Sequence, residues 1–183
     1  MSTSDSFALT EIIRWKPEPQ SIERDVRSLG DLLHACVNNG AAVSFILPFS
    51  RDEAAAFWRD QVAPAVIAGT CKLIIARNDM QQGLGTVQLD LKMPPNQPHR
   101  GEIRKLLVHP AARRQGIARA IMHAIEVEAL AAGRKLLTLD TASLAAEQLY
   151  ASLGYVRVGV IPRFSLHPVS SELEGTTVMY KEL

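Results

Sequence analysis

The sequence predicts an α/β protein with a mixed central sheet of about seven strands and helices on both faces. Segments of apolar or alternating residues predict the strands, and segments whose apolar residues recur at helical spacing predict the helices. Along the chain these occur as one strand, two helices, three strands, a helix, a strand, a helix and two strands. Residues 1–183 contain no repeat and no linker-like change in composition, so we expect a single domain.

Turn and capping residues set the boundaries of these elements. Ser21, Ser50 and Ser143 each precede a helical pattern, as N-cap residues do, and Gly133 follows one. Pro64 lies inside the second helical pattern and should kink or split it. The predicted elements are, in order, a strand over 12–15, helices over 22–37 and 51–67, strands over 71–77, 84–91 and 102–108, a helix over 115–132, a strand over 135–140, a helix over 144–153, and strands over 155–161 and 176–180.

Composition excludes several classes of partner. Lys and Arg number 20 against 19 Asp and Glu, so the net charge of +1 offers no broad attraction for nucleic acid or an anionic membrane. No apolar run has the length of a membrane span and the N-terminus lacks a signal pattern, so we expect a cytoplasmic protein. Cys36 and Cys71 lie in apolar patterns and are expected to be buried free thiols. The histidines show no metal-ligand spacing, so no metal site is expected.

The segment from Leu106 to Ala118 carries the clearest chemical signal. It consists of an apolar strand, a stop at Pro110, and an Arg- and Gly-rich turn that opens an amphipathic helix. Free N–H groups and the positive end of a helix dipole meet at such a turn, which suits a diphosphate, and Gly116 would let the phosphates approach the backbone. We therefore expect a phosphate-bearing ligand to be bound by Arg113, Arg114, Gln115, Gly116, Ile117 and Ala118.

The pattern Leu106-x-Val108-x-Pro110-x-x-Arg113-x-x-Gly116-x-Ala118 resembles the acetyl-CoA signature of the GCN5-related N-acetyltransferase (GNAT) family. Its last position is most often glycine in that family. The resemblance implies the GNAT fold, in which the fourth and fifth strands splay apart and the pantetheine arm of acetyl-CoA lies in the gap like an added strand. The backbone contacts with that arm would come from Leu106, Leu107 and Val108.

A second segment, from Ala146 to Tyr155, resembles the last helix and turn of the same family. There a tyrosine, Tyr150 here, stands four residues before a glycine and commonly lies near the sulfur of the cofactor. The resemblance therefore adds Tyr150 and Ser143 to the acetyl-CoA site, with Ser143 at a position where the family usually has Asn. The alternative interpretation of Tyr150 is a core aromatic residue with a satisfied hydroxyl.

An N-acetyltransferase of this kind needs a base and an acid. A primary ammonium has a pKa of about 10.4, so its proton must be removed before the amine attacks the thioester directly. Tyr150 could then protonate the departing thiolate. Asp140, at a strand end, and Glu102, at the start of the 102–108 strand, are the two candidate bases. Each has a simpler interpretation: Asp140 as an acceptor of turn hydrogen bonds, and Glu102 as a solvated strand end whose direction a bulge would reverse.

Two apolar segments, 43–49 and 161–168, are candidate walls for the acceptor amine, or else core plugs or subunit contacts. Over nearly its whole length the chain also resembles the tabtoxin-resistance type of acetyltransferase. That resemblance implies a small primary amine as acceptor, with an amino-acid-like toxin or antibiotic among the candidates. It is carried by residues 41–45, Glu102, 139–141 and 166–168.

We therefore expect an acetyl-CoA-dependent N-acetyltransferase that acts on a small-molecule amine. The resemblance also suggests a homodimer, because members of the family are often dimers. Three alternatives stay open: an enzyme that acetylates protein N-termini, a non-catalytic module that binds or senses CoA, and an interaction protein that uses the apolar loops as an interface.

Overall fold

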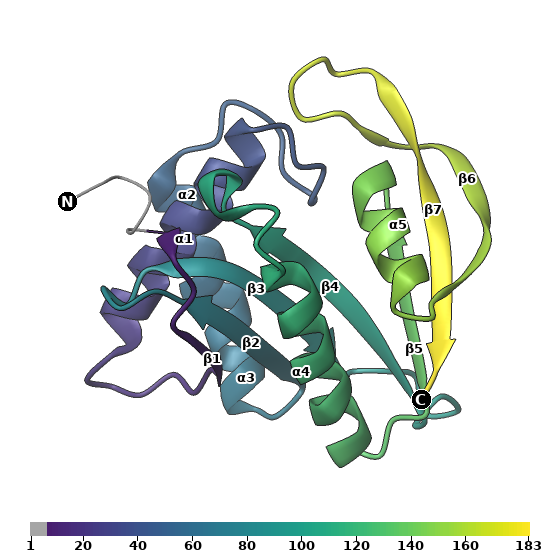
Figure 1. Cartoon of the computed structure of the whole chain (residues 1–183), viewed down its shortest axis with the longest axis horizontal. Helices are drawn as coiled ribbons and strands as arrows, with labels where there is room; N and C mark the ends of the chain where they lie inside the picture. The colour runs from purple at the N-terminus through teal and green to yellow at the C-terminus, as the bar shows by residue number, and fades with distance from the viewer. Residues whose placement is uncertain (1–6) are drawn as a thin grey trace.

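Seven strands of the computed structural model, which describes residues 7–183, form one mixed sheet (Figure 1). Their order across the sheet is β1-β2-β3-β4-β5-β7-β6, and β4 and β5 are parallel whereas the other neighbours are antiparallel. The strands are β1 Glu11–Arg14, β2 Cys71–Arg77, β3 Gly83–Asp90, β4 Arg100–Val108, β5 Leu136–Thr141, β6 Val156–Leu166 and β7 Leu173–Glu182. The predicted mixed sheet is confirmed.

Helices cover both faces of this sheet, as predicted. The segment from α1 to α3 lies on one face, and α4 and α5 lie on the other (Figure 1). The helices are α1 Ile22–Asn38, α2 Arg51–Ala56, the π-helical η2 Phe57–Val62, α3 Ala63–Ile67, the 3-10 turn η3 Pro110–Ala112, α4 Ile117–Ala131 and α5 Leu144–Ser152.

Strand β2 shows how the sequence pattern produces two cores. Successive side chains of a strand point to opposite faces, so Leu73 and Ile75 are buried with α1, whereas Ile74 is buried with α4. Because both faces are covered, the strand is almost continuously apolar rather than alternating. Cys36 and Cys71 are buried free thiols, as expected.

Of three local expectations, two were wrong and one was confirmed. Ser21 precedes α1 but makes no side-chain cap, because its backbone is turned, with ψ of −16°, rather than extended. The second helical segment splits next to Pro64, as predicted: it widens into η2 just before the proline, which occupies the first turn of the separate helix α3. Helix α4 begins at Ile117 rather than Gln115, because Gly116 adopts a left-handed φ of +80°.

The last two strands are longer than predicted. Pairing between β6 and β7 resumes after a register shift between Ile161 and Ser165 and continues to Leu166 and Leu173. Strand β6 lies at the edge of the sheet, and most of its side chains are exposed. Without a buried face the strand lacks the periodic pattern by which its full length could be recognised.

Asp25 of α1 is a buried carboxylate that joins the helix to the sheet. Trp15 Nε1 donates a hydrogen bond of 2.9 Å to it, and Arg77 of β2 lies 3.1 Å away, with the Asp25 and Arg77 side chains only 3% and 6% exposed. Burial alone would raise the pKa of Asp25, but the Trp15 hydrogen bond and the Arg77 and Arg24 guanidinium groups together hold it below the ordinary value.

We expect Asp25→Ala to lower the free energy of unfolding by about 3–5 kcal/mol, because it leaves the buried Arg77 charge unpaired. Because the pKa of Asp25 is lowered in the folded chain, this contribution is present above the ordinary carboxyl pKa and is lost as the pH falls through the lowered one. Urea unfolding measures both effects. Asp31→Ala on the same helix is the control: its exposed ion pair with Arg51 should contribute less than about 1 kcal/mol.

Candidate active site

The parallel strands β4 and β5 separate along most of their length. Their ladder pairs only Arg100–Glu102 with Leu136–Thr138, although β4 continues to Val108. On its other side β4 is paired with β3 as far as Val108. The part of β4 that contains Leu106, Leu107 and Val108 therefore has one edge without a strand partner. This is the predicted splay between the fourth and fifth strands.

A β-bulge at Lys105 marks the point where β4 turns away from β5. The register with β3 shifts between Thr86 and Gln88, and Lys105 has a left-handed φ of +49°. Ile103 and Leu107, an even number of residues apart, are consequently buried in opposite cores. The bulge thus changes which side chains of β4 face each side of the sheet.

The turn before α4, where the sequence predicts that residues 113–118 bind a diphosphate, is here called the cradle. Arg114 and Gly116 have positive φ values of +66° and +80°, and no side chain caps the first turn of α4. A Cβ atom placed on Gly116 would meet nothing within 4 Å, so open space lies beside this backbone. Gln115 is exposed, whereas Ile117 is buried and anchors the helix start in the core. The turn therefore presents free N–H groups and the positive end of a helix dipole.

The side chain of Arg113 connects this turn to α1 and to the end of β4 by hydrogen bonds. Its Nη1 donates a hydrogen bond of 2.8 Å to Asn39 Oδ1 at the end of α1, and its Nε donates to the Val108 carbonyl at 3.4 Å. These partners were not predicted, because Asn39 is distant in the sequence.

Tyr150 and Ser143 lie on α5, on the other side of the splay. Tyr150 is 5% exposed, and its ring centroid is 5.6 Å from that of Tyr155. Burial raises the pKa of Tyr150, and the charge of Asp140 adds to the shift, so the phenol is protonated at neutral pH. Ser143 Oγ accepts the N–H of Ala146 at 3.3 Å and caps α5, as predicted.

The two candidate bases line one pocket of about 200 Å³ next to the splay. Asp140 is exposed, and its Oδ2 accepts a hydrogen bond of 2.7 Å from Thr176 Oγ1. The side chain of Leu139, the residue before Asp140, is buried in the core on the α4 face of the sheet, as strand alternation predicts. The pocket is lined by Glu102, Thr138, Leu139, Asp140, Ile161, Phe164, Thr176 and Val178.

Glu102 is more heavily engaged than Asp140. Its Oε1 lies 3.1 Å from Arg104 Nε, and its Oε2 lies 3.7 Å from Arg100 Nη1. Arg104 in turn reaches Asp90 at 3.2 Å. Both oxygens of Glu102 therefore face guanidinium groups, whereas Asp140 has a hydroxyl as its hydrogen-bond donor.

The two segments predicted to wall the acceptor site, 43–49 and 161–168, contact each other. The N–H of Leu47 donates a hydrogen bond of 3.1 Å to the carbonyl of Pro168. From the second segment, Ile161 and Phe164 line the pocket. The segments 43–49 and 161–168, far apart in the sequence, are thus in direct contact.

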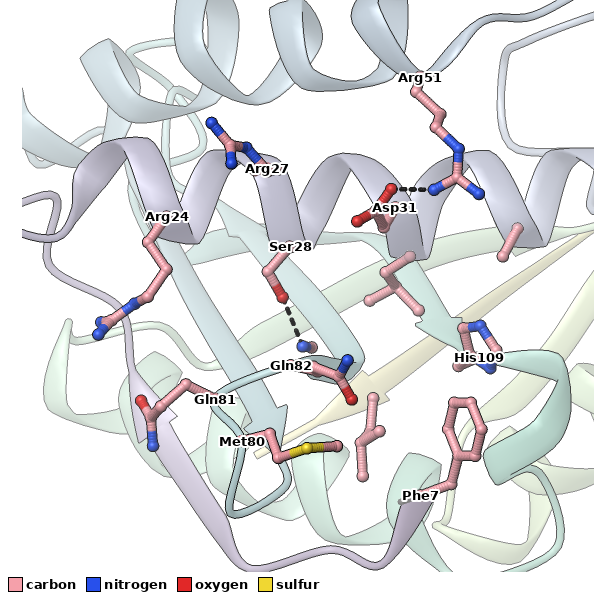
Figure 2. A pocket seen from close by; sticks show the side chains of 14 residues that line it. Phe7, Arg24, Arg27, Ser28, Asp31, Arg51, Met80, Gln81, Gln82 and His109 are labelled. Atoms are coloured by element: carbon pink, nitrogen blue, oxygen red, sulfur yellow. Dashed lines mark hydrogen bonds and ion pairs between the residues drawn. The ribbon is translucent and has the colours of Figure 1, made fainter. Parts of the chain in front are cut away.

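A larger cavity of about 540 Å³ lies elsewhere, between α1 and the β2–β3 turn, and shares no residue with the pocket at the splay. Figure 2 shows Gln82 between Ser28 of α1 and His109, whose ring stacks on Phe7 at 4.7 Å between centroids. His109 is half-buried here. No sequence pattern indicated this cavity, because loops and one helix face form it.

None of the helices in residues 7–183 is long and apolar enough to cross a membrane. In the same residues, no three His, Cys, Asp or Glu side chains come together as a metal site would require.

Comparison with known families identifies the fold around the splay. Residues 69–157, from just before β2 to the start of β6, match the acetyltransferase (GNAT) domain. The chain carries a GNAT acetyltransferase domain. The GNAT domain accounts for the splayed β4–β5 pair and the Gly116 turn together, and the prediction of an acetyl-CoA-dependent N-acetyltransferase is confirmed.

Solved structures of low sequence identity share the fold of this GNAT domain. A ribosomal-protein-alanine N-acetyltransferase from Brucella melitensis is 19% identical, with 95% of this chain and 100% of that chain covered and a TM-score of 0.76. A phosphinothricin acetyltransferase from Sinorhizobium meliloti, in complex with acetyl-CoA, is 18% identical, with coverages of 96% and 88% and a TM-score of 0.75. A putative acetyltransferase from Salmonella typhimurium, also with acetyl-CoA, is 16% identical, with coverages of 96% and 94% and a TM-score of 0.75.

Proposed function

We propose that this protein transfers the acetyl group of acetyl-CoA to a primary amine of a small molecule. The observation that carries the proposal is one arrangement: an unpaired edge of β4, the Gly116 turn at one end of it, and a pocket holding Asp140 and Glu102 beside it. The first two features suit the donor and the third suits the acceptor.

Two features of this chain fit acetyl-CoA. The free edge of β4 at Leu106, Leu107 and Val108 can bind the pantetheine arm as an added strand would. The open space beside Gly116, at an uncapped helix start, can receive the diphosphate. We assign the remaining diphosphate contacts to the backbone of Arg113, Arg114, Gln115, Ile117 and Ala118, and a contact with the arm to Ser143.

When bound, acetyl-CoA supplies the acetyl group as a thioester. Asp140 is the group that we assign to take the proton from the acceptor ammonium, because it is exposed in the pocket and carries no ion pair there. A backbone N–H of Leu107 or Val108 is assigned to the thioester oxygen. Tyr150, kept protonated by burial, is assigned to return a proton to the sulfur.

The pocket favours a small acceptor. Its volume of about 200 Å³ suits a compact amine, and the segment that contributes Ile161 and Phe164 to its lining is held to segment 43–49 by the Leu47–Pro168 contact. Thiol release from acetyl-CoA, followed with a chromogenic disulfide over a panel of amino-acid-like amines and of peptides, tests this. Turnover with peptides alone would favour N-terminal acetylation of proteins. Acetyl-CoA binding without turnover of any amine would favour a CoA-sensing module.

We expect Gly116→Val to weaken acetyl-CoA binding by about tenfold or more, because a side chain would enter the cradle and strain the turn. Acetyl-CoA at 100 times its Kd should stabilise the unaltered protein by about 2.7 kcal/mol, and the variant much less at the same concentration. Gly133→Val is a matched control, because Gly133 has a similar φ of +73° and equally open surroundings beyond the other end of α4. Equal loss of acetyl-CoA binding in both variants would contradict the cradle.

A further inference from the structure

Lys105 sends its side chain from the bulge of β4 to the loop between α1 and α2, residues 41–49, which we name the acceptor loop. Its Nζ donates hydrogen bonds of 2.8 Å to the Val43 carbonyl and 3.0 Å to Ser44 Oγ. The same nitrogen lies 5.4 Å from the ring centroid of Phe45 and 5.7 Å from that of Phe57. One ammonium therefore makes two hydrogen bonds and two cation–π contacts.

The backbone at both ends of this link is strained. Lys105 has a φ of +49° and Ser44 a φ of +74°, both in the left-handed region that non-glycine residues rarely adopt. Such conformations persist where surrounding interactions impose them, and they cluster at functional sites. The contact between the Lys105 ammonium and Ser44 Oγ joins these two strained residues directly.

This link lies next to the acceptor pocket. The acceptor loop continues from Ser44 to Leu47, whose N–H donates to Pro168 beyond the end of β6. Asp140 in the pocket also acts electrostatically on the Lys105 ammonium. The loop is therefore fixed at two points, by the Lys105 ammonium and by the Pro168 carbonyl.

We propose that Lys105 is a positioning residue that latches the acceptor loop over the acceptor pocket and so sets the affinity for the amine. The part of this inference that concerns the amine rests on the proposed function, whereas the latch itself does not. Acetyl-CoA binding at the Gly116 turn should be almost independent of the latch, because Lys105 makes no contact with that turn.

The charge of Lys105 makes the latch sensitive to pH. Burial, together with the charge of Arg104 on the same strand, lowers the pKa of Lys105 to about 8 against the opposing charge of Asp140 on β5. The acceptor loop and η2 contribute a carbonyl, a hydroxyl and two rings to this contact, and no charge. Because the pKa of Lys105 is lower in the latched loop than in an open, solvated one, the latch should become more stable as the pH rises from about 8 towards the ordinary lysine pKa.

Hydrogen exchange of the acceptor-loop amides, Leu47 above all, tests the latch without any substrate. After correction for intrinsic exchange rates, we expect Lys105→Met to lose about tenfold in protection at pH 7. The unaltered protein should gain protection between pH 7 and 9.5. Lys105→Arg should show no such gain, because arginine stays charged. Lys72→Met is the matched control, since Lys72 pairs with Glu128 on another part of the fold.

Ser44→Ala provides a second variant that leaves the lysine in place, and it should also lower protection at pH 7. The latch is overturned if Lys105→Met keeps the protection of the unaltered protein, or if protection changes equally with rising pH in the Lys105→Arg and unaltered proteins. With an amine that is turned over, Lys105→Met should raise KM about tenfold, with little change in kcat or in acetyl-CoA affinity by calorimetry. Failure of the unaltered protein to bind acetyl-CoA counts against the proposed function alone.

Discussion

Replacing Tyr150 with Phe is expected to lower kcat by about 10²–10⁴-fold, the usual contribution of one positioned proton transfer. Phenylalanine keeps the ring that packs against Tyr155 and removes only the hydroxyl, so the fold and the affinity for acetyl-CoA should be retained. The rate of thiol release at saturating acetyl-CoA and amine measures the change. Because the pKa of Tyr150 is raised by burial, its ionisation should not reduce the rate until well above pH 10.

Tyr155→Phe provides the matched control for this prediction. Tyr155 is buried in the same core, and its pKa is raised by burial and by the charge of Glu126, but no role in the proton transfer is assigned to it. A rate close to that of the unaltered protein is expected. If Tyr150→Phe also keeps the full rate, Tyr150 is a packing residue and the thiolate takes its proton from elsewhere.

Local patterns were sufficient to predict the order of the elements and the position of the cofactor turn. Strand β2 begins and ends where the apolar run does, and Gly116 interrupts the chain where the Arg- and Gly-rich turn predicts. The parallel pairing of β4 with β5 follows from the helix between them, because such a crossover returns the chain in the same direction. Residues close in sequence determine all of these features.

Features that depend on distant partners could not be predicted. The direction of Glu102 depends on the bulge at Lys105, which is defined only by the register with β3. The link from Lys105 to Ser44 joins segments that lie far apart along the chain, and so does the bond from Arg113 to Asn39. Periodicity within one element carries no information about such contacts, so the ion pairs that engage Glu102 emerged only from the fold.

Because Glu102 has these ion pairs and Asp140 does not, substitutions can distinguish which of the two is the base. Asp140→Asn is expected to lower kcat/KM by about 10²–10⁴-fold at neutral pH, because the amide keeps an acceptor for the Thr176 hydroxyl but cannot take a proton. Glu102→Gln should have a much smaller effect. To accept a proton, Glu102 would have to give up its contacts with Arg104 and Arg100.

Thr176→Val refines the assignment of the base. It removes the donor that orients Asp140 while leaving the carboxylate in place, so its effect on kcat/KM should lie between those of the other two variants. Acetyl-CoA affinity, measured by calorimetry on all three, should stay unchanged, because none of these residues belongs to the cradle. If Glu102→Gln proves the more damaging change, the proton is taken at the start of β4. The Arg104–Glu102 pair would then have to open when the amine binds.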